Sequence, residues 1–343
     1  GEIDATGKTT KATQTTAGGT TSRIHSMSGA TVTTADSGAT GFVCAGGGGN
    51  INFNSTDKVE DGEISSGWLG PQQLTPVDMP IPFTDSSAYG GEVIIDGDWA
   101  FVAATRYSGD PSSEGQVFAF LRSGSTWSQT QIISAPGNEV LNNYGSDISK
   151  SGDTLVIGAE SSNTAGQGSA YVYTLQGSTW TYQADLLHPN TDDTDWGMGG
   201  SVNISGDTLV VGAIGDDTVD TLAGSAVVFT RSGSTWTSQQ VLTGIGQVAE
   251  LFGSDVAIDG DTIVVGAYKD NTTGLDAGAV HIFTRSGTTW TEEQKIDGEL
   301  TGSWFGYSVS ISGDTVVVGA SGYLGSPHGD GKVWHNMDTG TKF

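Results

Sequence analysis

Cysteine, basic residues and long apolar runs are all scarce in this chain. Cys44 is the single cysteine, so no disulfide can form within the chain. Only 13 Lys and Arg stand against 39 Asp and Glu, and the resulting formal charge of −26 opposes binding to nucleic-acid phosphates. No apolar run approaches the roughly 18 residues that a membrane-spanning helix needs. The sequence therefore predicts no nucleic-acid partner and no membrane span.

Signatures of catalysis are scarce as well. The five His lack the spacing of metal ligands, and the Gly-rich run 46–49 lacks the Lys of a phosphate-binding loop. No Gly-x-Ser-x-Gly segment stands in a strand-turn-helix setting. Pairs of acidic residues are so frequent that finding two close together carries little weight. We therefore do not expect an enzyme, and we assign no catalytic residue.

Glycine is abundant, with 53 residues of 343, and it marks an internal repeat. Gly-Asp pairs recur every 53 to 55 residues before short apolar runs, beginning at Gly97, Gly152, Gly206, Gly260 and Gly313. A second series follows Gly-Ser-Thr-like turns, at Trp127, Trp180, Trp236 and Trp290. Five copies of a unit of about 54 residues therefore organise the chain. We expect the repeated Trp residues to be packing elements at equivalent positions.

One unit can be followed strand by strand. Residues 254–259 alternate, and Asp259-Gly260 is expected to form a two-residue hairpin turn in which positive φ favours Gly. The apolar run 262–267 is typical of a strand covered on both faces. Further strands are expected at 279–284 and 290–296, and no segment has a sustained helical period. The fold class predicted is all-β, a β-propeller of four-stranded antiparallel blades.

Two short motifs recur with the repeat. An aromatic-Gly pair stands at Phe252-Gly253 and Phe305-Gly306, with variants at Tyr144-Gly145 and Trp196-Gly197 and a weaker copy at Tyr89-Gly90. A Gly-Ala pair stands at Gly158-Ala159, Gly212-Ala213, Gly266-Ala267 and Gly319-Ala320. These motifs resemble those of the FG-GAP repeat family, the integrin-α-like β-propellers, in its bacterial form. The resemblance covers about residues 66–335 and implies the propeller fold. It also assigns Trp196 and Trp304 to the position before the blade Gly, as structural residues.

Many members of that family hold calcium in a loop of spaced Asp residues between the first two strands of a blade. Here the corresponding connection is only Ser-Gly or Asp-Gly. Such a turn is too short to wrap a cation that needs six to eight oxygen ligands. The calcium sites of the family are therefore not expected at these positions.

The blades are expected near residues 89–133, 144–187, 196–242, 252–296 and 305–336, within a propeller domain at 61–343. The fifth copy lacks a fourth strand, while residues 66–75 resemble residues 234–243 without a blade of their own. We therefore expect a five-bladed ring in which residues 66–75 supply the fourth strand of the last blade, with Trp68 beside Lys332–Asn336. Such closure would remove exposed sheet edges. The alternative is a sixth, degenerate blade at 29–75.

Residues 1–60 differ from the rest, because they hold five acids and four bases and are rich in Thr and Gly. They are expected to form an N-terminal arm, either flexible or pairing with other structural subunits. No secretory signal is visible at the first residue, which favours a virion setting slightly over a secreted one.

The connections after the second and fourth strands are long, and they should emerge together on one face of the ring. Function sits more often on long loops over a rigid scaffold. The ligand-binding residues expected on this face are Tyr107, Asp110, Tyr144, Trp196, Tyr323 and His328. The metal-ligand candidates, with calcium as the possible cation, are Asp192, Asp193, Asp195, Asp216, Asp217 and Asp220. The alternative for these acids is ordinary loop chemistry, since Asp favours turns.

The function expected is that of a non-catalytic, externally displayed structural or binding module. Two extracellular settings fit, a virion surface or tail-appendage protein and a cell-surface adhesin, with a glycan or a surface receptor as ligand. The acidic composition suits a protein that faces open surroundings. The alternative is a hydrolase or lyase that acts on polysaccharide, which the fold alone permits.

Overall fold

The computed structural model describes residues 25–26, 44–45, 74, 89–105, 115–136, 142–161, 167–190, 197–244, 248–322 and 332–335. Every regular element in these residues is a β-strand, and five antiparallel sheets follow one another along the chain. Each sheet is a blade, and blades 1 to 4 have four strands in simple up-and-down order. The predicted all-β fold with four-stranded antiparallel blades is confirmed.

The strands have the following bounds. Blade 1 contains β3 (Tyr89–Asp96), β4 (Trp99–Ala104), β5 (Gln116–Ser123) and β6 (Thr126–Ser134). Blade 2 contains β7 (Asn142–Ser151), β8 (Thr154–Ser161), β9 (Ser169–Gln176) and β10 (Thr179–Leu186). Blade 3 contains β11 (Met198–Ser205), β12 (Thr208–Ala213), β13 (Ser225–Ser232) and β14 (Thr235–Thr243). Blade 4 contains β15 (Val256–Asp259), β16 (Thr262–Ala267), β17 (Ala279–Ser286) and β18 (Thr289–Asp297). Blade 5 contains β19 (Phe305–Ser312), β20 (Thr315–Ala320) and β21 (Lys332–His335), and the short pair β1 (His25–Ser26) and β2 (Cys44–Ala45) precedes blade 1.

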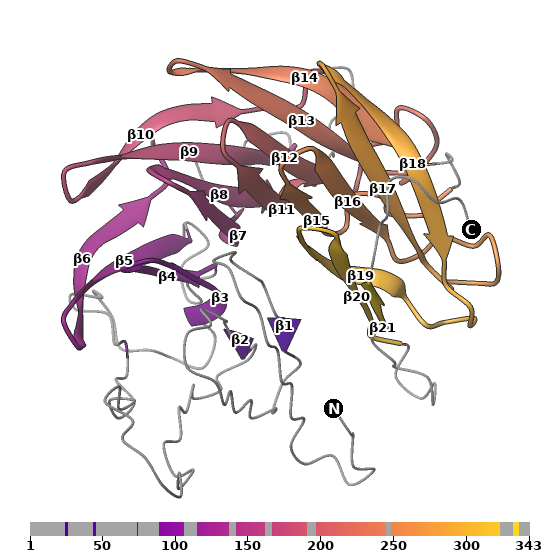
Figure 1. Cartoon of the computed structure of the whole chain (residues 1–343), viewed down its shortest axis with the longest axis horizontal. Coiled ribbons are helices and arrows are strands. Elements are labelled where there is room, and N and C mark those ends of the chain that lie inside the picture. The colour runs from indigo at the N-terminus through magenta and orange to yellow at the C-terminus, as the bar shows by residue number, and fades with distance from the viewer. Residues whose placement is uncertain are drawn as a thin grey trace, which may run out of the picture.

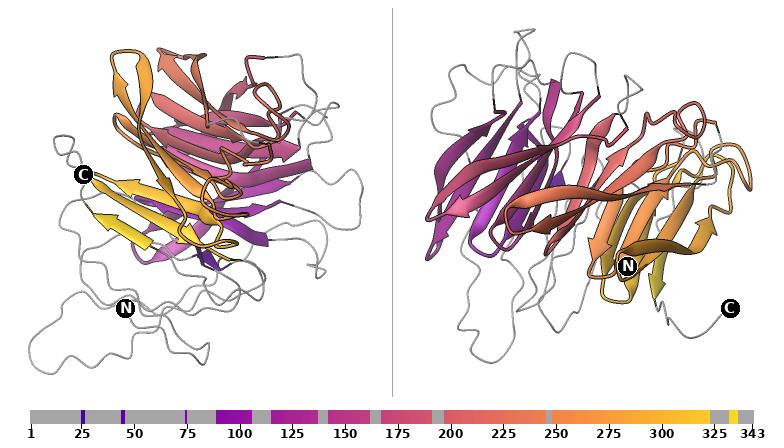
Figure 2. Two further views of the ribbon diagram at one scale, coloured as in Figure 1. Left: turned by 90° about the vertical axis from the view of Figure 1, so that its right-hand side faces the viewer. Right: turned by 90° about the horizontal axis from the view of Figure 1, so that it is seen from above.

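The five sheets are arranged as an arc, with the first strand of each blade on the concave side (Figure 1). The side views show the sheets stacked face to face (Figure 2). Apolar side chains fill the space between neighbouring blades. On β12, Leu209 and Val211 pack toward blade 2 while Val210, between them, packs toward blade 4. The second strand of each interior blade is a continuous apolar run because a neighbour covers both of its faces.

The FG and GA motifs form a close backbone contact between blades. A Cβ atom at Gly266 would lie 2.0 Å from the carbonyl oxygen of Gly306 in the next blade. Gly306 itself has a φ of 89°, which side chains rarely allow. Phe305, directly before it, is buried in the core that joins blades 4 and 5. The two motifs are therefore the two sides of one contact, which explains their common period.

Blade 3 makes this contact through Met198-Gly199, and the assignment of Trp196-Gly197 to the motif was wrong. A Cβ atom at Gly158 would lie 2.0 Å from the carbonyl oxygen of Gly199, and Met198 is fully buried. The pair Met198-Gly199 also has the correct spacing, since Gly199 lies 54 residues from both Gly145 and Gly253. Trp196-Gly197 was mistaken for the motif because it is also an aromatic residue followed by Gly, two positions earlier.

Buried polar side chains join the first strands of successive blades. Asp147 accepts a hydrogen bond from the Val202 amide at 2.7 Å, and Asp255 accepts one from the Val309 amide at 2.6 Å. Between them, the Ser201 hydroxyl lies 2.8 Å from Asp255 Oδ1 and 3.3 Å from Asp147 Oδ2. Each of these amides belongs to the next blade along the arc. The carboxylates therefore hold the blades in register.

The short turns share a second network at the opposite end of the blades. Arg285 donates from Nε to Asp261 Oδ1 at 2.7 Å, and its guanidinium lies 5.1 Å from the centre of the Trp290 ring. Arg285 also donates to Thr208 of the preceding blade at 2.8 Å. The predicted packing role of the repeated Trp residues is confirmed, since Trp180, Trp236 and Trp290 are buried and the half-buried Trp127 packs against the core of blade 1. The two turn residues are Gly260 and Asp261, one position later than predicted.

The two ends of the arc do not meet in the described part of the chain. The first strands contact one another in the series β3, β7, β11, β15, β19, and no contact of similar extent joins β19 to β3 among these strands. The short strand β2 contacts β3. Ring closure, and the number of blades in a closed ring, therefore stay predictions.

Leu74 is the one described residue of the segment predicted to close the ring. It packs against the core of blade 1 that contains Val102 and Phe118, and its carbonyl oxygen accepts a hydrogen bond from the Tyr89 hydroxyl at 3.1 Å. Leu242, at the matching position of the repeat, packs against blade 4 in the same way. Trp68, the rest of residues 66–75, and residues 1–60 apart from β1 and β2 lie outside the described residues.

Candidate functional site

The long connections of neighbouring blades lie together at one end. The loop 214–224, between β12 and β13, pairs with the connection into blade 4, where Ala249 N donates to Thr221 O at 2.8 Å. The loop 268–278 pairs in the same way with the connection into blade 5. Main-chain hydrogen bonds therefore order these loops as parts of the blade interfaces. We call this end the long-loop face, formed in the described chain by residues 214–224, 248–252, 268–278 and 298–304.

Asp216 anchors the loop of blade 3 and is 2% exposed. Its Oδ1 accepts hydrogen bonds from the Thr218 amide, at 2.8 Å, and from the Thr218 hydroxyl. Its Oδ2 lies 3.3 Å from Nε2 of His188, which comes from blade 2. Because the Asn190 amide donates to His188 Nδ1 at 3.3 Å, the imidazole proton is assigned to Nε2. Burial alone would raise the pKa of Asp216, but the hydrogen bonds from His188, Ser225 and Thr218 lower that pKa to about 2.

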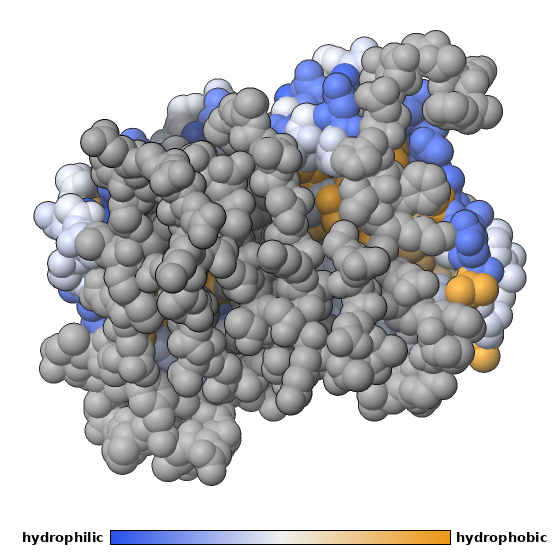
Figure 3. Space-filling model, turned by 60° about the horizontal axis from the view of Figure 1, so that its bottom comes forward, coloured by the Kyte–Doolittle hydropathy of each residue, from blue (hydrophilic) through white to orange (hydrophobic). Residues whose placement is uncertain are grey.

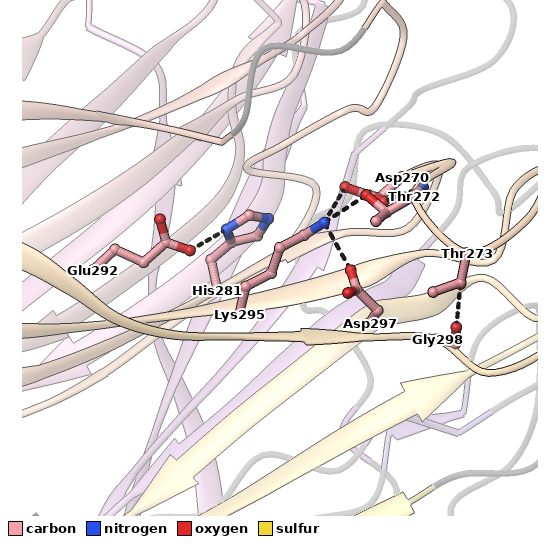
Figure 4. Close-up of polar contacts among 8 residues, drawn as sticks. All are labelled: Asp270, Thr272, Thr273, His281, Glu292, Lys295, Asp297 and Gly298. Carbon is pink, nitrogen blue, oxygen red and sulfur yellow. Dashed lines mark hydrogen bonds and ion pairs between the residues drawn. The ribbon is translucent and has the colours of Figure 1, made fainter. Parts of the chain in front are cut away.

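Asp270 occupies the equivalent place in blade 4 but has a Lys as its partner (Figure 4). Lys295 Nζ lies 2.9 Å from Asp270 Oδ2 and 2.7 Å from Asp297 Oδ1. The Thr272 amide donates to Asp270 Oδ1 at 2.7 Å, as Thr218 does in blade 3. Burial opposes ionisation of Asp270, but these partners keep its pKa below the usual value. The buried Asp thus follows the repeat, while the residue that pairs with it does not.

The buried His281 pairs with the exposed Glu292 beside these residues (Figure 4). Its Nδ1 lies 2.8 Å from Glu292 Oε1, and its ring packs against Phe252 with 5.0 Å between the ring centres. The hydrogen bond from His281 lowers the pKa of Glu292. His281 lies within β17, as the sequence predicted, and it is fully buried. His281 therefore lies in the core, whereas Glu292 lies at the surface.

The acidic residues of loop 214–224 bond their own backbone. Asp217 accepts a hydrogen bond from the Leu222 amide, and Asp220 accepts one from the Thr221 amide at 2.8 Å. Within the described residues, no group of three or more His, Cys, Asp or Glu could hold a metal ion. In the structure Asp216, Asp217 and Asp220 make loop hydrogen bonds, and a cation shared by them stays a prediction. Asp192, Asp193 and Asp195 lie outside the described residues, so calcium there stays a prediction.

Tyr144, one of the residues expected to bind a ligand, lies in the core. It is fully buried between blades 1 and 2, and its hydroxyl lies 2.7 Å from that of Tyr173. Burial raises the pKa of Tyr144 far above its usual value. Contrary to the expectation, the Tyr144 side chain offers no surface to a ligand, because it is the buried aromatic residue of the FG motif in blade 2. The other ligand candidates, Tyr107, Asp110, Trp196, Tyr323 and His328, lie outside the described residues.

Three aromatic rings gather on the long-loop face where blades 4 and 5 meet. Tyr268 begins the loop 268–278, and its ring centre lies 5.6 Å from that of Trp304 and 5.2 Å from that of Tyr307. The Trp304 and Tyr307 rings are nearly parallel, at 17°, with their centres 6.1 Å apart. Tyr307 is 50% exposed, and Tyr268 and Trp304 are half-buried. These three residues form the aromatic cluster.

The aromatic cluster is held by main-chain hydrogen bonds. Trp304 N donates to Asp276 O at 3.2 Å, and Tyr307 N donates to Trp304 O at 3.1 Å. Trp304 has a φ of 52° and stands directly before Phe305, so it does not replace the motif aromatic as expected. Burial raises the pKa of Tyr268, and nearby Tyr307, Asp276 and Glu160 raise it further. The cluster therefore has acidic neighbours.

Sequence reasoning named Trp304 only as a structural residue and passed over Tyr268 and Tyr307. The usable signal was their departure from the repeat. Tyr307 stands where other blades have Ser146, Gly200 and Ser254, directly after the motif Gly. A comparison of the copies position by position would have shown that Tyr307 is an aromatic substitution. It would not have shown that the Tyr307 ring contacts the Tyr268 ring.

The comparison with family models agrees with this architecture. The model described as FG-GAP repeat matches residues 127–173, 180–229, 236–283 and 290–333. Each match begins at one of the repeated Trp residues and ends in the third strand of the next blade. Together the matches cover more than half of the chain. No curated protein matches it.

Proposed function

Because the chain belongs to the FG-GAP repeat family, we propose that it is a non-catalytic binding module displayed outside a cell or on a virion. It would act as a virion surface or tail-appendage protein, or as a cell-surface adhesin. Its ligand would be a glycan or a surface receptor, bound at the long-loop face. The formal charge of −26, with only 13 basic residues, suits a protein that faces open surroundings.

The contrast between the two ends of the blades carries this proposal. At the short-turn end the side chains Asp261, Arg285 and Trp290 bond one another. At the long-loop face main-chain hydrogen bonds and Asp side chains hold the loop backbone, and the side chains of Leu222 and Leu275 are exposed, as is that of Tyr307 on the adjoining β19. A rigid scaffold with outward-facing apolar and aromatic groups is the usual build of a binding surface.

The described residues contain no helix long and apolar enough to cross a membrane. Hydrophobic residues also show on the described surface in Figure 3, next to hydrophilic ones.

The proposal is tested by measuring whether the labelled full chain is retained on bacterial cells and on polysaccharide-coated beads. Reducing ends released from the polysaccharide are measured in parallel. We expect retention without release. Leu222→Asn with Leu275→Asn should weaken retention, and Asn tolerates the positive φ of Leu222. The control is Tyr182→Asn on β10, whose side chain is 42% exposed. New reducing ends would instead support a hydrolase or lyase, and absence of retention would refute the binding function.

We also propose that residues 1–60 pair with other structural subunits. Their near-neutral composition supports this, since most of the net charge lies in residues 61–343. Hydrogen exchange on the isolated and assembled protein tests it. Slower exchange in the assembly is expected, whereas equally rapid exchange in both states would leave only a linker.

A further inference from the structure

The fold does not require the rings of the aromatic cluster. At the position of Tyr307 the other blades carry Gly or Ser, and blades 3 and 4 make the same FG–GA contact with those residues. At the position of Trp304 blades 2 to 4 carry Asn143, Gly197 and Leu251, all with the same left-handed φ. Blades 2 and 3 likewise place Glu160 and Ile214 at the position of Tyr268. Three aromatic departures from the repeat meeting at one interface therefore need an explanation beyond packing.

The arrangement of the rings limits what they can bind. Their centres lie 5.2 to 6.1 Å apart, so the rings contact one another and leave no cage for a cation. Lys269 Nζ already lies 6.0 Å from the centre of the Tyr268 ring. The most exposed ring is Tyr307, at 50%, and it stacks on Trp304 at 17° to form an aromatic slab, whereas Tyr268 meets both of these rings edge-on, at 69° and 61°. A slab of this kind suits a flat ligand that has an apolar face.

Two carboxyl groups lie near Tyr268. The carboxyl groups of Asp276 and Glu160 act on Tyr268, and Glu160 lies over Gly200, 3.5 Å from where a Cβ atom would stand. These carboxylates and the Tyr hydroxyls can accept hydrogen bonds from several hydroxyl groups at once. Two carboxylates and a net charge of −26 would repel an anionic ligand.

From this combination we propose that Tyr268, Trp304 and Tyr307 form the stacking site for an uncharged pyranose unit of a polysaccharide. The C–H face of the sugar would pack on the exposed Tyr307 side of the slab, and its hydroxyl groups would bond Glu160, Asp276 and the Tyr hydroxyls. This inference rests on the proposed function and names the ligand class of its binding face.

The test uses the full chain and soluble polysaccharides in affinity electrophoresis: neutral dextran, mannan and galactan, and acidic alginate and hyaluronan. At least one neutral polysaccharide should retard the protein, and the acidic ones should not. Tyr307→Ser should weaken that retardation at least tenfold. Ser is the residue of blades 2 and 4 at this position, so the variant should fold. Tyr182→Ser, on the outer strand β10, is the matched control and should bind as the unmodified chain does.

The outcomes separate the two proposals. Retardation by a neutral polysaccharide that Tyr307→Ser leaves unchanged overturns this site but keeps the binding module. Retardation only by acidic polysaccharides overturns the assignment of an uncharged sugar. Retention on cells that survives periodate oxidation of their glycans identifies a protein receptor and also overturns it. Absence of both retardation and cell retention refutes the proposed function itself.

Discussion

The interior of the arc and its C-terminal end contain almost the same sequence in different surroundings. The second strand reads TIVVGA in blade 4 and TVVVGA in blade 5. Val264 of blade 4 is fully buried against blade 5, whereas Val317, its equivalent, is 44% exposed. Gly266 meets the backbone of the next blade, while Gly319 meets only Ser308 of its own blade. The repeat therefore specifies a blade made for two neighbours, whether or not both are present.

The N-terminal end of the arc differs from both. The face of blade 1 that would meet a preceding blade is covered in part by Leu74, and Tyr89 is hydrogen-bonded to that residue. One end thus carries a fragment of a missing neighbour, and the other end lacks a fourth described strand. The ends complement each other, which is the arrangement that ring closure by residues 66–75 requires.

The largest effect is expected from truncation. Removing residues 1–76 deletes Leu74 and the acceptor of the Tyr89 hydroxyl, and exposes the Val102 face of blade 1. A loss of about 4 kcal/mol should lower the melting temperature by roughly 6 °C in a chain of this size. Removing residues 1–60 should leave it unchanged. Calorimetry measures the melting temperature of both truncated chains. Equal melting temperatures would contradict the predicted role of residues 66–75 in closing the ring.

The next effect compares two leucines at one repeat position. Leu242→Ala should destabilise the chain by about 3 kcal/mol, since that side chain is buried between blades 3 and 4. Leu74→Ala should cost about half as much, because Leu74 is only half-buried. Urea unfolding measures both. Leu275→Ala, at a side chain that is 69% exposed, is the control and should change stability by less than about 0.5 kcal/mol. A Leu74→Ala cost as small as that control would show that the two positions are not equivalent.

The blades themselves were predictable because the period, the turns and the apolar runs agree. The predicted strand 262–267 matches β16, and the predicted 279–284 matches β17 to within two residues. The candidate site was less predictable. Asp216 and Asp270 share a repeat position, but their partners differ, since His188 lies in the connection after β10 and Lys295 lies on β18. A periodic sequence gives the backbone position of a residue, whereas the partner of its side chain depends on contacts that single copies acquire separately.

A smaller difference should separate the two valines that open this comparison. Val264→Ala should cost about 2 kcal/mol, because it leaves a cavity between blades 4 and 5. Val317→Ala should cost less than about 0.5 kcal/mol, because its side chain is 44% exposed. The two variants remove the same atoms from the same strand position. Equal costs in urea unfolding would mean that the outer face of blade 5 is covered in solution as fully as that of blade 4.

The smallest effect concerns the hydroxyl of Tyr89. Tyr89→Phe removes its hydrogen bond to Leu74 and should cost about 1 kcal/mol at pH 7. Burial raises the pKa of Tyr89 above its ordinary value of 10.0. The unfolded chain therefore loses this proton first, so the stability that Tyr89 contributes is complete below about pH 10 and declines as the pH rises further. Tyr89→Phe should show a shallower loss of stability between pH 9 and 11 than the unmodified chain, as followed by urea unfolding at each pH.

The same substitution in the chain that lacks residues 1–76 should have almost no effect at pH 7, because the acceptor on Leu74 is gone. An undiminished effect in that truncated chain would show that Tyr89 does not act through Leu74.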